Sequence, residues 1–216
     1  MGKPSYILGL TPMEAWRIAR HTLPFTRNAP AWTVMELMTS PKHSRGIRFA
    51  ELLLRQEAVA ARNMKRQPIS FENRRVVEIG CGPLGGFGPM AIFCGATQFE
   101  SADPEWDDGL FFDPQVVEYY HRLHYADLVS LFGKRLGFDE FITTMRERIL
   151  VKRTGFEKAP IEGQVDVVLS QSVLEHVFPV EDTISKLSQI QHPRTQILQL
   201  VELGNHYPTA NPFEGL

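Results

Sequence analysis

VVEIGCGPLGG, at residues 76–86, places an apolar strand directly before a glycine-rich turn. Because glycine has no Cβ, backbone at such a turn can approach a ligand closely, and the N–H groups of the following helix point toward the same place. An acid, Glu78, stands two residues ahead of Gly80. Dinucleotide-binding turns usually carry apolar residues there, whereas an acid suits a ligand with a positively charged end. The segment predicts a strand–turn–helix unit that holds such a ligand at its glycines.

From residue 74 onward the sequence alternates between strand and helix patterns. This alternation is typical of an α/β fold in which helices cover both faces of a parallel sheet. We expect strands at Arg75–Ile79, Gln98–Ala102, Arg148–Val151, Val165–Ser170 and Thr195–Leu203. In such sheets, ligands bind outside the carboxyl ends of the strands. Glu78, Asp103 and Ser170 all fall at those ends, which predicts one shared site.

Three segments in this order resemble the motifs of the S-adenosylmethionine-dependent methyltransferases of Rossmann-like fold. Glu78-x-Gly80-x-Gly82 is similar to the first motif of that family. Residues 99–103 resemble its second strand, which ends in an acid, and residues 165–177 resemble its fourth motif. The likeness covers about residues 74–205. It implies a three-layer α/β sandwich with a mostly parallel sheet.

The resemblance also implies a set of residues that bind S-adenosylmethionine. Glu78 would reach the ammonium of the cofactor directly or through water. Asp103 would accept hydrogen bonds from both ribose hydroxyls, because a carboxylate offers two acceptor oxygens to a vicinal diol. Ser170 and Gln171 would border the methyl group and the acceptor. The full expected set is Glu78, Gly80, Cys81, Gly82, Gly85, Asp103, Pro104, Ser170 and Gln171.

Two histidines are candidates for the catalytic base. His176 follows the fourth strand, where the alternative is a structural histidine at the start of the next helix, and His206 follows the fifth strand. The residue that contacts adenine is left open. The family often has an acid or asparagine after the third strand, but this sequence offers only Phe156, which could stack on adenine, or Glu157.

The sequence divides at about residue 70. Residues 1–70 predict an N-terminal helical extension, with one helix from about Gly46 to Lys65. Its predicted buried face consists of Phe49, Leu52, Leu53, Gln56 and Val59. This extension either lies over the active-site mouth and touches substrate, or only packs against the sheet.

Residues 71–216 form the expected cofactor-binding domain, with a helical insertion at about 104–147. One inserted helix should open at Asp113-Pro114 and end at Gly133, and another should begin at Asp139. The insertion is either a substrate wall, a dimer surface or an extra packing layer. The sequence stops soon after the fifth strand, whereas the resembled fold continues with two more strands. We therefore expect a truncated chain or a shortened variant, and the alternative is that a partner covers the exposed edge of the sheet.

Composition narrows the possible partners and compartment. The chain has 216 residues, a net charge of −2 and 22% charged residues, so no basic field would draw nucleic acid toward it. No apolar run approaches the ~18 residues that a membrane span needs. Its two cysteines, Cys81 and Cys94, lack a metal-ligand spacing and are expected to be free thiols. We expect no metal site, no nucleic-acid or membrane partner and a cytoplasmic location.

The expected function is methyl transfer from S-adenosylmethionine to a small molecule or a saccharide. The saccharide option rests on residues 203–207 and 211–213, which loosely resemble methyltransferase-like proteins associated with surface-polysaccharide synthesis. Two alternatives remain open. The turn also satisfies the dinucleotide pattern G-x-G-x-x-G, so a nicotinamide-dependent oxidoreductase is possible. The second alternative is a non-catalytic relative that keeps the fold as a binding module.

Overall fold

The computed structural model describes residue 34 and residues 46–64 and 68–201. Its sheet has five parallel strands in the order β3-β2-β1-β4-β5. The strands are β1 (Arg75–Ile79), β2 (Gln98–Ala102), β3 (Ile149–Lys152), β4 (Val167–Gln171) and β5 (Gln196–Leu200). The chain starts in the middle of the sheet, moves outward to β3 and then returns to the other side of β1. Strand order therefore reverses between β1 and β4, where ligands bind in folds of this kind.

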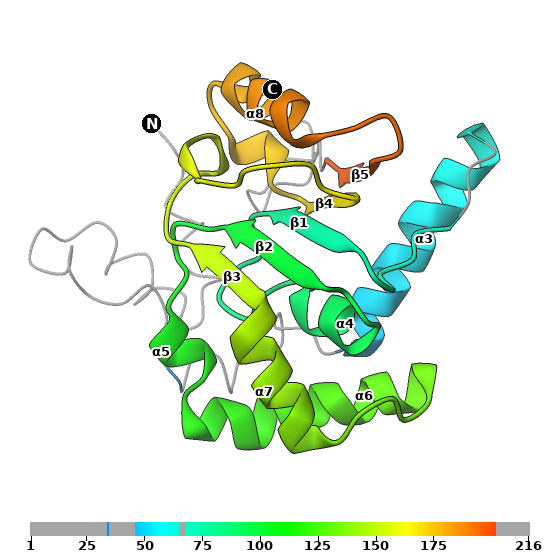
Figure 1. Cartoon of the computed structure of the whole chain (residues 1–216), viewed down its shortest axis with the longest axis vertical. Helices are drawn as coiled ribbons and strands as arrows, with labels where there is room; N and C mark the ends of the chain where they lie inside the picture. The colour runs from blue at the N-terminus through cyan, green and yellow to red at the C-terminus, as the bar shows by residue number, and fades with distance from the viewer. Residues whose placement is uncertain (1–33, 35–45, 65–67, 202–216) are drawn as a thin grey trace, which may run out of the picture. The chain divides into compact units, whose positions relative to one another are not determined.

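Helices cover both faces of the sheet and make three layers (Figure 1). α8 (Val180–Ile190) lies on one face, and four helices lie on the other: α3 (Gly46–Met64), α4 (Gly88–Phe93), α6 (Arg122–Phe132) and α7 (Phe138–Arg148). Shorter pieces connect them: α5 (Asp108–Phe111), the π-helical η3 (Val116–His121), and the 3-10 helices η4 (Phe156–Lys158) and η5 (Leu174–His176). The Rossmann-like α/β sandwich expected from the sequence is confirmed.

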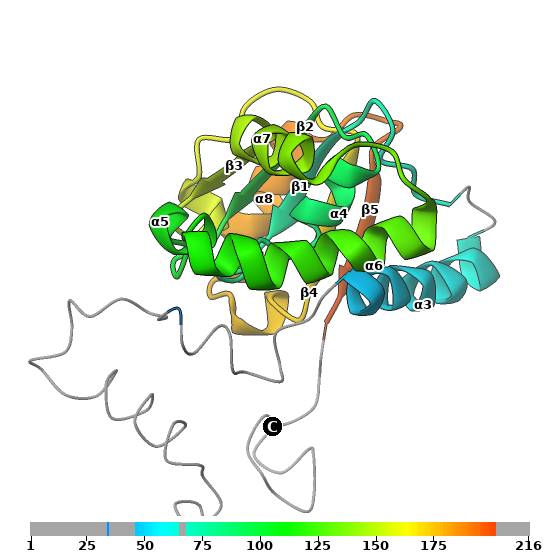
Figure 2. The same cartoon turned by 90° about the horizontal axis from the view of Figure 1, so that it is seen from below.

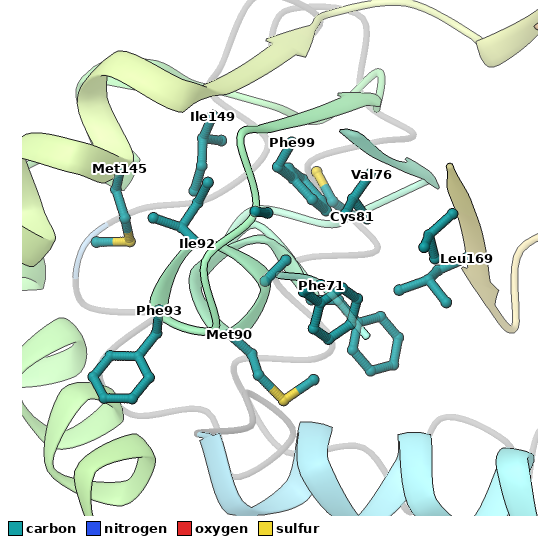
Figure 3. Close-up of a cluster of buried hydrophobic side chains, with 14 of the residues drawn as sticks. Phe71, Val76, Cys81, Met90, Ile92, Phe93, Phe99, Met145, Ile149 and Leu169 are labelled. Carbon is teal, nitrogen blue, oxygen red and sulfur yellow. The ribbon is translucent and has the colours of Figure 1, made fainter. Parts of the chain in front are cut away.

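Each face of the sheet has its own apolar core, because successive side chains of a strand point to opposite faces. On the α4 side, the core includes Val76, Leu169 and Phe99 from the sheet and helix residues such as Met90 and Phe93 (Figure 3). On the α8 side, the sheet residues Val77, Ile79 and Val168 pack with Leu187 and Ile190. The strands are thus apolar on both faces, as a doubly covered parallel sheet requires.

The predicted strand positions agree closely with the structure. β1 and β2 have the predicted bounds, and β3 begins and ends one residue later than predicted. β4 begins at Val167, two residues later than predicted, and the N–H of Val165 donates to the carbonyl of Ile190 at the end of α8. β5 begins one residue later than predicted and ends at Leu200, since Val201 is not part of the strand. The predicted end of this strand, Leu203, lies outside the described residues.

The predicted insertion is helical. Its first helix is capped by Asp113, whose Oδ1 accepts the N–H of Gln115 at 2.8 Å, and it runs through η3 and α6 to Gly133. Gly133 has a φ of +74°, which ends the helix where the sequence predicts. The π-helical part was not expected. α7 begins at Phe138, one residue before the predicted start.

The prediction for α3 is correct in extent and partly wrong in its buried face. Ala50, Leu53 and Gln56 are buried, but Val59 is 62% exposed. α3 and α6 lie side by side in Figure 2, and the C-terminal half of α3 continues past the sheet in both views. Val59 therefore has little to pack against. In the described part of the chain, no helix combines the length and apolar character needed to cross a membrane.

Candidate functional site

The glycine-rich turn after β1 has two different sides. Gly80 and Gly82 have φ values of +68° and +64°, which favour glycine. A Cβ on Gly80 would lie 2.8 Å from a methyl carbon of Val173, so this glycine packs against the chain that follows β4. A Cβ on Gly82 would meet no described atom within 4 Å. The turn thus closes against Val173 on one side and leaves open space at Gly82, where a ligand can approach the backbone.

Glu78 lies beneath this turn. The side chain comes from β1 and is only 1% exposed, and its Oε2 accepts the N–H of Phe87 at 2.8 Å. The same carboxylate faces the Cα of Gly86 so closely that a side chain at Gly86 would collide with it. Burial raises the pKa of Glu78 well above its usual value, and nearby Asp103 adds to this, while the Phe87 hydrogen bond lowers it. The acid therefore stands directly behind the backbone that would meet the ligand.

Asp103 joins the end of β2 to the same turn. Its Oδ2 accepts the N–H of Gly82 at 2.6 Å, and its Oδ1 accepts the N–H of Glu105 at 2.8 Å. Burial raises the pKa of Asp103, and the two hydrogen bonds act in the opposite direction. Pro104 follows at the surface, and its carbonyl accepts the Nε–H of Arg153 at 3.4 Å. The predicted convergence of Glu78, Asp103 and the glycine turn is therefore present.

Ser170 and Gln171 point to opposite faces of the sheet. Ser170 is paired with Ile79 in the sheet, so its fully buried side chain lies on the α8 face. Its Oγ has no hydrogen-bond partner among the described residues. Gln171 points to the other face, where its Oε1 accepts the Nε2–H of Gln56 from α3 at 2.6 Å. The structure thus places the side chain of Gln171, and not that of Ser170, on the face of the sheet where Glu78 lies.

Two further predicted turn residues pack against the interior of the fold. Cys81 is buried in the core on the α4 side, and burial is the main reason why the pKa of its thiol is raised. Gly85 has a φ of +75°, and a Cβ there would lie 3.0 Å from the ring of Phe111. Phe111 in turn receives a hydrogen bond on its carbonyl from Nε2 of the buried His121, at 2.8 Å. The insertion therefore supplies one wall of the turn.

The candidate catalytic and adenine-binding residues lie in different surroundings in the structure. His176 lies at the surface in η5, after the carboxyl end of β4, and not at the start of α8. His206 lies outside the described residues. Stacking of Phe156 on adenine is contradicted, because Phe156 is 3% exposed and belongs to the core on the α8 side. Glu157 bends back over Gly155, with its Oε1 3.8 Å from Nζ of Lys158.

Two residues that contact predicted site residues were not expected from the sequence. Gln56 was assigned to the packing face of a helix, yet its amide contacts the end of β4. Phe111 was not singled out, although it packs against Gly85. The one available signal was a glutamine among otherwise apolar positions of a predicted helix face. Among the residues that the structure describes, no group of histidine, cysteine and acidic side chains could hold a metal ion.

The similarity of this chain to known proteins is a similarity of fold. No family model and no curated protein matches this chain. It is similar to the solved structure of an S-adenosylmethionine-dependent methyltransferase from Mesorhizobium loti, with 20% identity, 68% of this chain and 53% of that chain covered, and a TM-score of 0.40. It is also similar to the YcgJ protein from Bacillus subtilis, with 12% identity, 74% and 52% coverage and a TM-score of 0.40.

A protein arginine methyltransferase from Arabidopsis thaliana is a further similar structure, with 18% identity, 57% and 29% coverage and a TM-score of 0.35. Several of the similar structures are methyltransferases by name. This chain spans about half the length of the Mesorhizobium loti and Bacillus subtilis proteins. At these identities and TM-scores, the likeness concerns the arrangement of strands and helices alone.

Proposed function

We propose that this chain is an S-adenosylmethionine-dependent methyltransferase that acts on a small-molecule or saccharide acceptor. The observation that carries the proposal is the convergence of two carboxylates on one glycine turn. Glu78 lies beneath the turn and Asp103 contacts Gly82 within it. The open space at Gly82 allows a ligand to approach the backbone. A ligand with an ammonium at one end and a ribose diol at the other matches this pair of acids.

The residues divide the binding of this cofactor among them. The two oxygens of Asp103 are suited to the ribose hydroxyls, and Glu78 can ionise beside an ammonium and so supply negative charge behind the methionine end. Once bound, S-adenosylmethionine supplies an electrophilic methyl group, whose S–C bond breaks with its electron pair left on sulfur. The chain then has to orient the acceptor and exclude competing water. His176, exposed beyond β4, is the described candidate to take the acceptor's proton, and His206 remains a second candidate.

The backbone N–H groups at the start of α4 already donate hydrogen bonds within the protein, which favours S-adenosylmethionine over a nicotinamide dinucleotide. A dinucleotide fold needs free N–H groups at the helix start for the pyrophosphate. Here the N–H of Phe87 donates to Glu78, and the N–H of Gly88 donates to the carbonyl of Gly85. A carboxylate in this place would also oppose a second anion. The glycine turn therefore fits a cation-bearing ligand better than a diphosphate.

The proposed acceptor class follows from the charge of the chain and from its C-terminal residues. The net charge of −2 gives no broad attraction to nucleic acid. The segments that suggested a saccharide, residues 203–207 and 211–213, lie outside the described residues. We keep a small molecule or saccharide as the proposed acceptor, and the cytoplasm as the proposed location.

Calorimetric titration of the purified chain tests the cofactor assignment. S-adenosylhomocysteine should bind with a dissociation constant in the micromolar range, and NAD should not bind. Asp103→Ala should abolish most of the binding, whereas Glu162→Ala, an exposed acid, should not change it. A folded chain that binds NAD but not S-adenosylhomocysteine would establish the oxidoreductase alternative. Binding of S-adenosylhomocysteine with no turnover across an acceptor screen would favour the non-catalytic alternative.

A further inference from the structure

A chain of polar side chains runs from α3 to the segment after β4. Nε2 of Gln56 donates to Oε1 of Gln171 at 2.6 Å, and Nε2 of Gln171 donates to Oγ of Ser172 at 3.1 Å. Gln56 and Gln171 are 115 positions apart in the sequence. Two glutamines in direct contact at the carboxyl edge of a sheet are not needed for packing, since apolar side chains of the same size would fill this space.

One end of this polar chain is buried and unused. Gln56 is only 8% exposed, and its Oε1 has no hydrogen-bond partner among the described residues. Leaving a buried carbonyl oxygen without a partner is costly, so folded proteins rarely do so without a reason. Oε1 of Gln56 is a hydrogen-bond acceptor, so only a group with an O–H or N–H can be its partner.

The polar chain ends beside the glycine turn. Ser172 has a φ of +53°, an unusual conformation for a residue other than glycine, and such strain concentrates at functional sites. The next residue, Val173, is the one whose methyl carbons lie against Gly80. Gln171 and Ser172 therefore lie beside the glycine turn, where the resemblance to methyltransferases places the transferred methyl group.

We infer that Gln56 is the residue of α3 that binds the methyl acceptor, and that the acceptor presents a hydroxyl or an amine. This inference rests on the proposed function. Oε1 of Gln56 accepts the O–H or N–H of the acceptor and thereby directs a lone pair of its oxygen or nitrogen toward the methyl group. Methyl transfer then forms an O–CH₃ or N–CH₃ bond, breaks the S–CH₃ bond with its electrons left on sulfur, and releases the acceptor's proton to His176 or to water. A carboxylate acceptor offers no such donor and is disfavoured.

Gln171 has a supporting role in this arrangement. Its Oε1 holds the NH₂ group of Gln56, which fixes the amide plane while Oε1 of Gln56 keeps no partner among the described residues. Gln171 is thus a positioning residue for Gln56. This explains why α3 carries a polar residue within its buried face.

Two cofactor analogues test this role without knowledge of the acceptor. Sinefungin carries an amine-bearing carbon in place of the methyl-bearing sulfur, so its N–H groups project to the acceptor side, whereas S-adenosylhomocysteine has no group there. Calorimetric titration of the full chain with both ligands should show that Gln56→Met weakens sinefungin binding about tenfold or more. Binding of S-adenosylhomocysteine should change less than about threefold.

The controls separate this inference from the proposed function. Gln189→Met, the same substitution at an exposed position of α8, should leave both affinities unchanged. If Gln56→Met does not fold, as judged by circular dichroism, Gln171→Met, which removes the group that positions Gln56, carries the same comparison. An unchanged ratio of the two affinities in the folded variants would overturn the inference while the cofactor assignment stands. Failure of the unmodified chain to bind either ligand would overturn the proposed function, and the inference with it.

Discussion

Oδ2 of Asp103 accepts the backbone N–H of Gly82 at 2.6 Å. This hydrogen bond ties the end of β2 to the turn after β1, so the two parts of the candidate site hold each other in place before any ligand arrives. The same carboxylate also accepts the N–H of Glu105 through Oδ1. A single side chain thus both organises the turn and presents the oxygens proposed for the ribose.

Removal of the Asp103 carboxylate should therefore reduce stability as well as binding. Asp103→Ala leaves the N–H groups of Gly82 and Glu105 without their acceptor, which should lower the free energy of unfolding by about 1–3 kcal/mol. Urea denaturation of the ligand-free chain measures this loss. Glu162→Ala, at an exposed position, serves as the control. Equal stability of Asp103→Ala and the unmodified chain would show that the two hydrogen bonds do not organise the turn.

The two glycines of the turn should respond differently to alanine. Both have positive φ, which costs a non-glycine residue about 1–2 kcal/mol. At Gly80 the new methyl group would also collide with Val173, at 2.8 Å, so Gly80→Ala should be clearly the less stable variant in urea denaturation. At Gly82 the new methyl group meets no described atom, so Gly82→Ala should chiefly weaken binding of S-adenosylhomocysteine.

A second substitution separates steric clash from backbone strain at Gly80. Val173→Ala removes the methyl carbons that the new side chain would meet, so it should recover part of the stability lost in Gly80→Ala. The recovered part measures the clash, and the remainder measures the cost of positive φ. Additive losses in the double variant would mean that Val173 does not limit the space at Gly80.

Stability should fall with rising pH because of Glu78. Burial raises the pKa of Glu78 in the folded state above its usual value of 4.5, so between these two values the folded state binds more protons than the unfolded state. The contribution of Glu78 is fully present below about pH 4.5 and is lost as pH rises through the folded pKa, at about 1.4 kcal/mol for each unit of pKa difference. Glu78→Gln cannot titrate. Urea denaturation between pH 4.5 and 8 should show this variant gaining stability relative to the unmodified chain.

The same variant should bind the cofactor less tightly. An ammonium beside Glu78 favours the ionised form of this acid, whereas an amide cannot ionise, so we expect Glu78→Gln to weaken binding of S-adenosylhomocysteine about tenfold. If Glu78→Gln is more stable than the unmodified chain but binds S-adenosylhomocysteine less tightly, the role of Glu78 is ligand binding rather than stability. A stability difference that stays constant with pH would contradict the raised pKa.

His121 should produce the opposite pH dependence. Burial, with a smaller contribution from Arg146, lowers the pKa of His121 from 6.5 to about 4, although the hydrogen bond to the carbonyl of Phe111 raises it. The unfolded state therefore binds more protons between pH 6.5 and 4, and stability is lost as pH falls through this range, by about 3 kcal/mol in total. His121→Gln keeps an N–H donor for Phe111 but does not titrate. It should flatten the acid side of the stability profile measured by urea denaturation.

The thiols should be slow to react in the folded chain. Burial raises the pKa of Cys94 from 9.0 to about 11, which reduces its thiolate fraction near pH 8 about 100-fold, and the pKa of the buried Cys81 is also raised well above its usual value. Alkylation by iodoacetamide at pH 8, followed by mass spectrometry, should therefore proceed about 100-fold more slowly at Cys94 than in the urea-unfolded chain. Comparable rates in the two states would show that these thiols are accessible.

Local patterns predict the elements well in this chain. The apolar strand that ends in Gly80 and the capped helix from Asp113 to Gly133 depend on neighbouring residues only, and both are present. Phe156 shows the limit of such reasoning. An aromatic residue after a strand suits a ligand face and a core equally well, and only its packing with Val77 and Val168 identifies it as core.

The sequence by itself determined where β1 and β2 run, where the turn lies and which acids stand at the strand ends. These features follow from hydrophobic patterning and from the backbone freedom of glycine, which act over a few residues. Only the tertiary structure decided that the side chain of Ser170 faces α8 and that Gln171 meets Gln56 across 115 positions. Such contacts depend on which faces of distant elements pack together, and this is a property of the whole folded core rather than of any one segment.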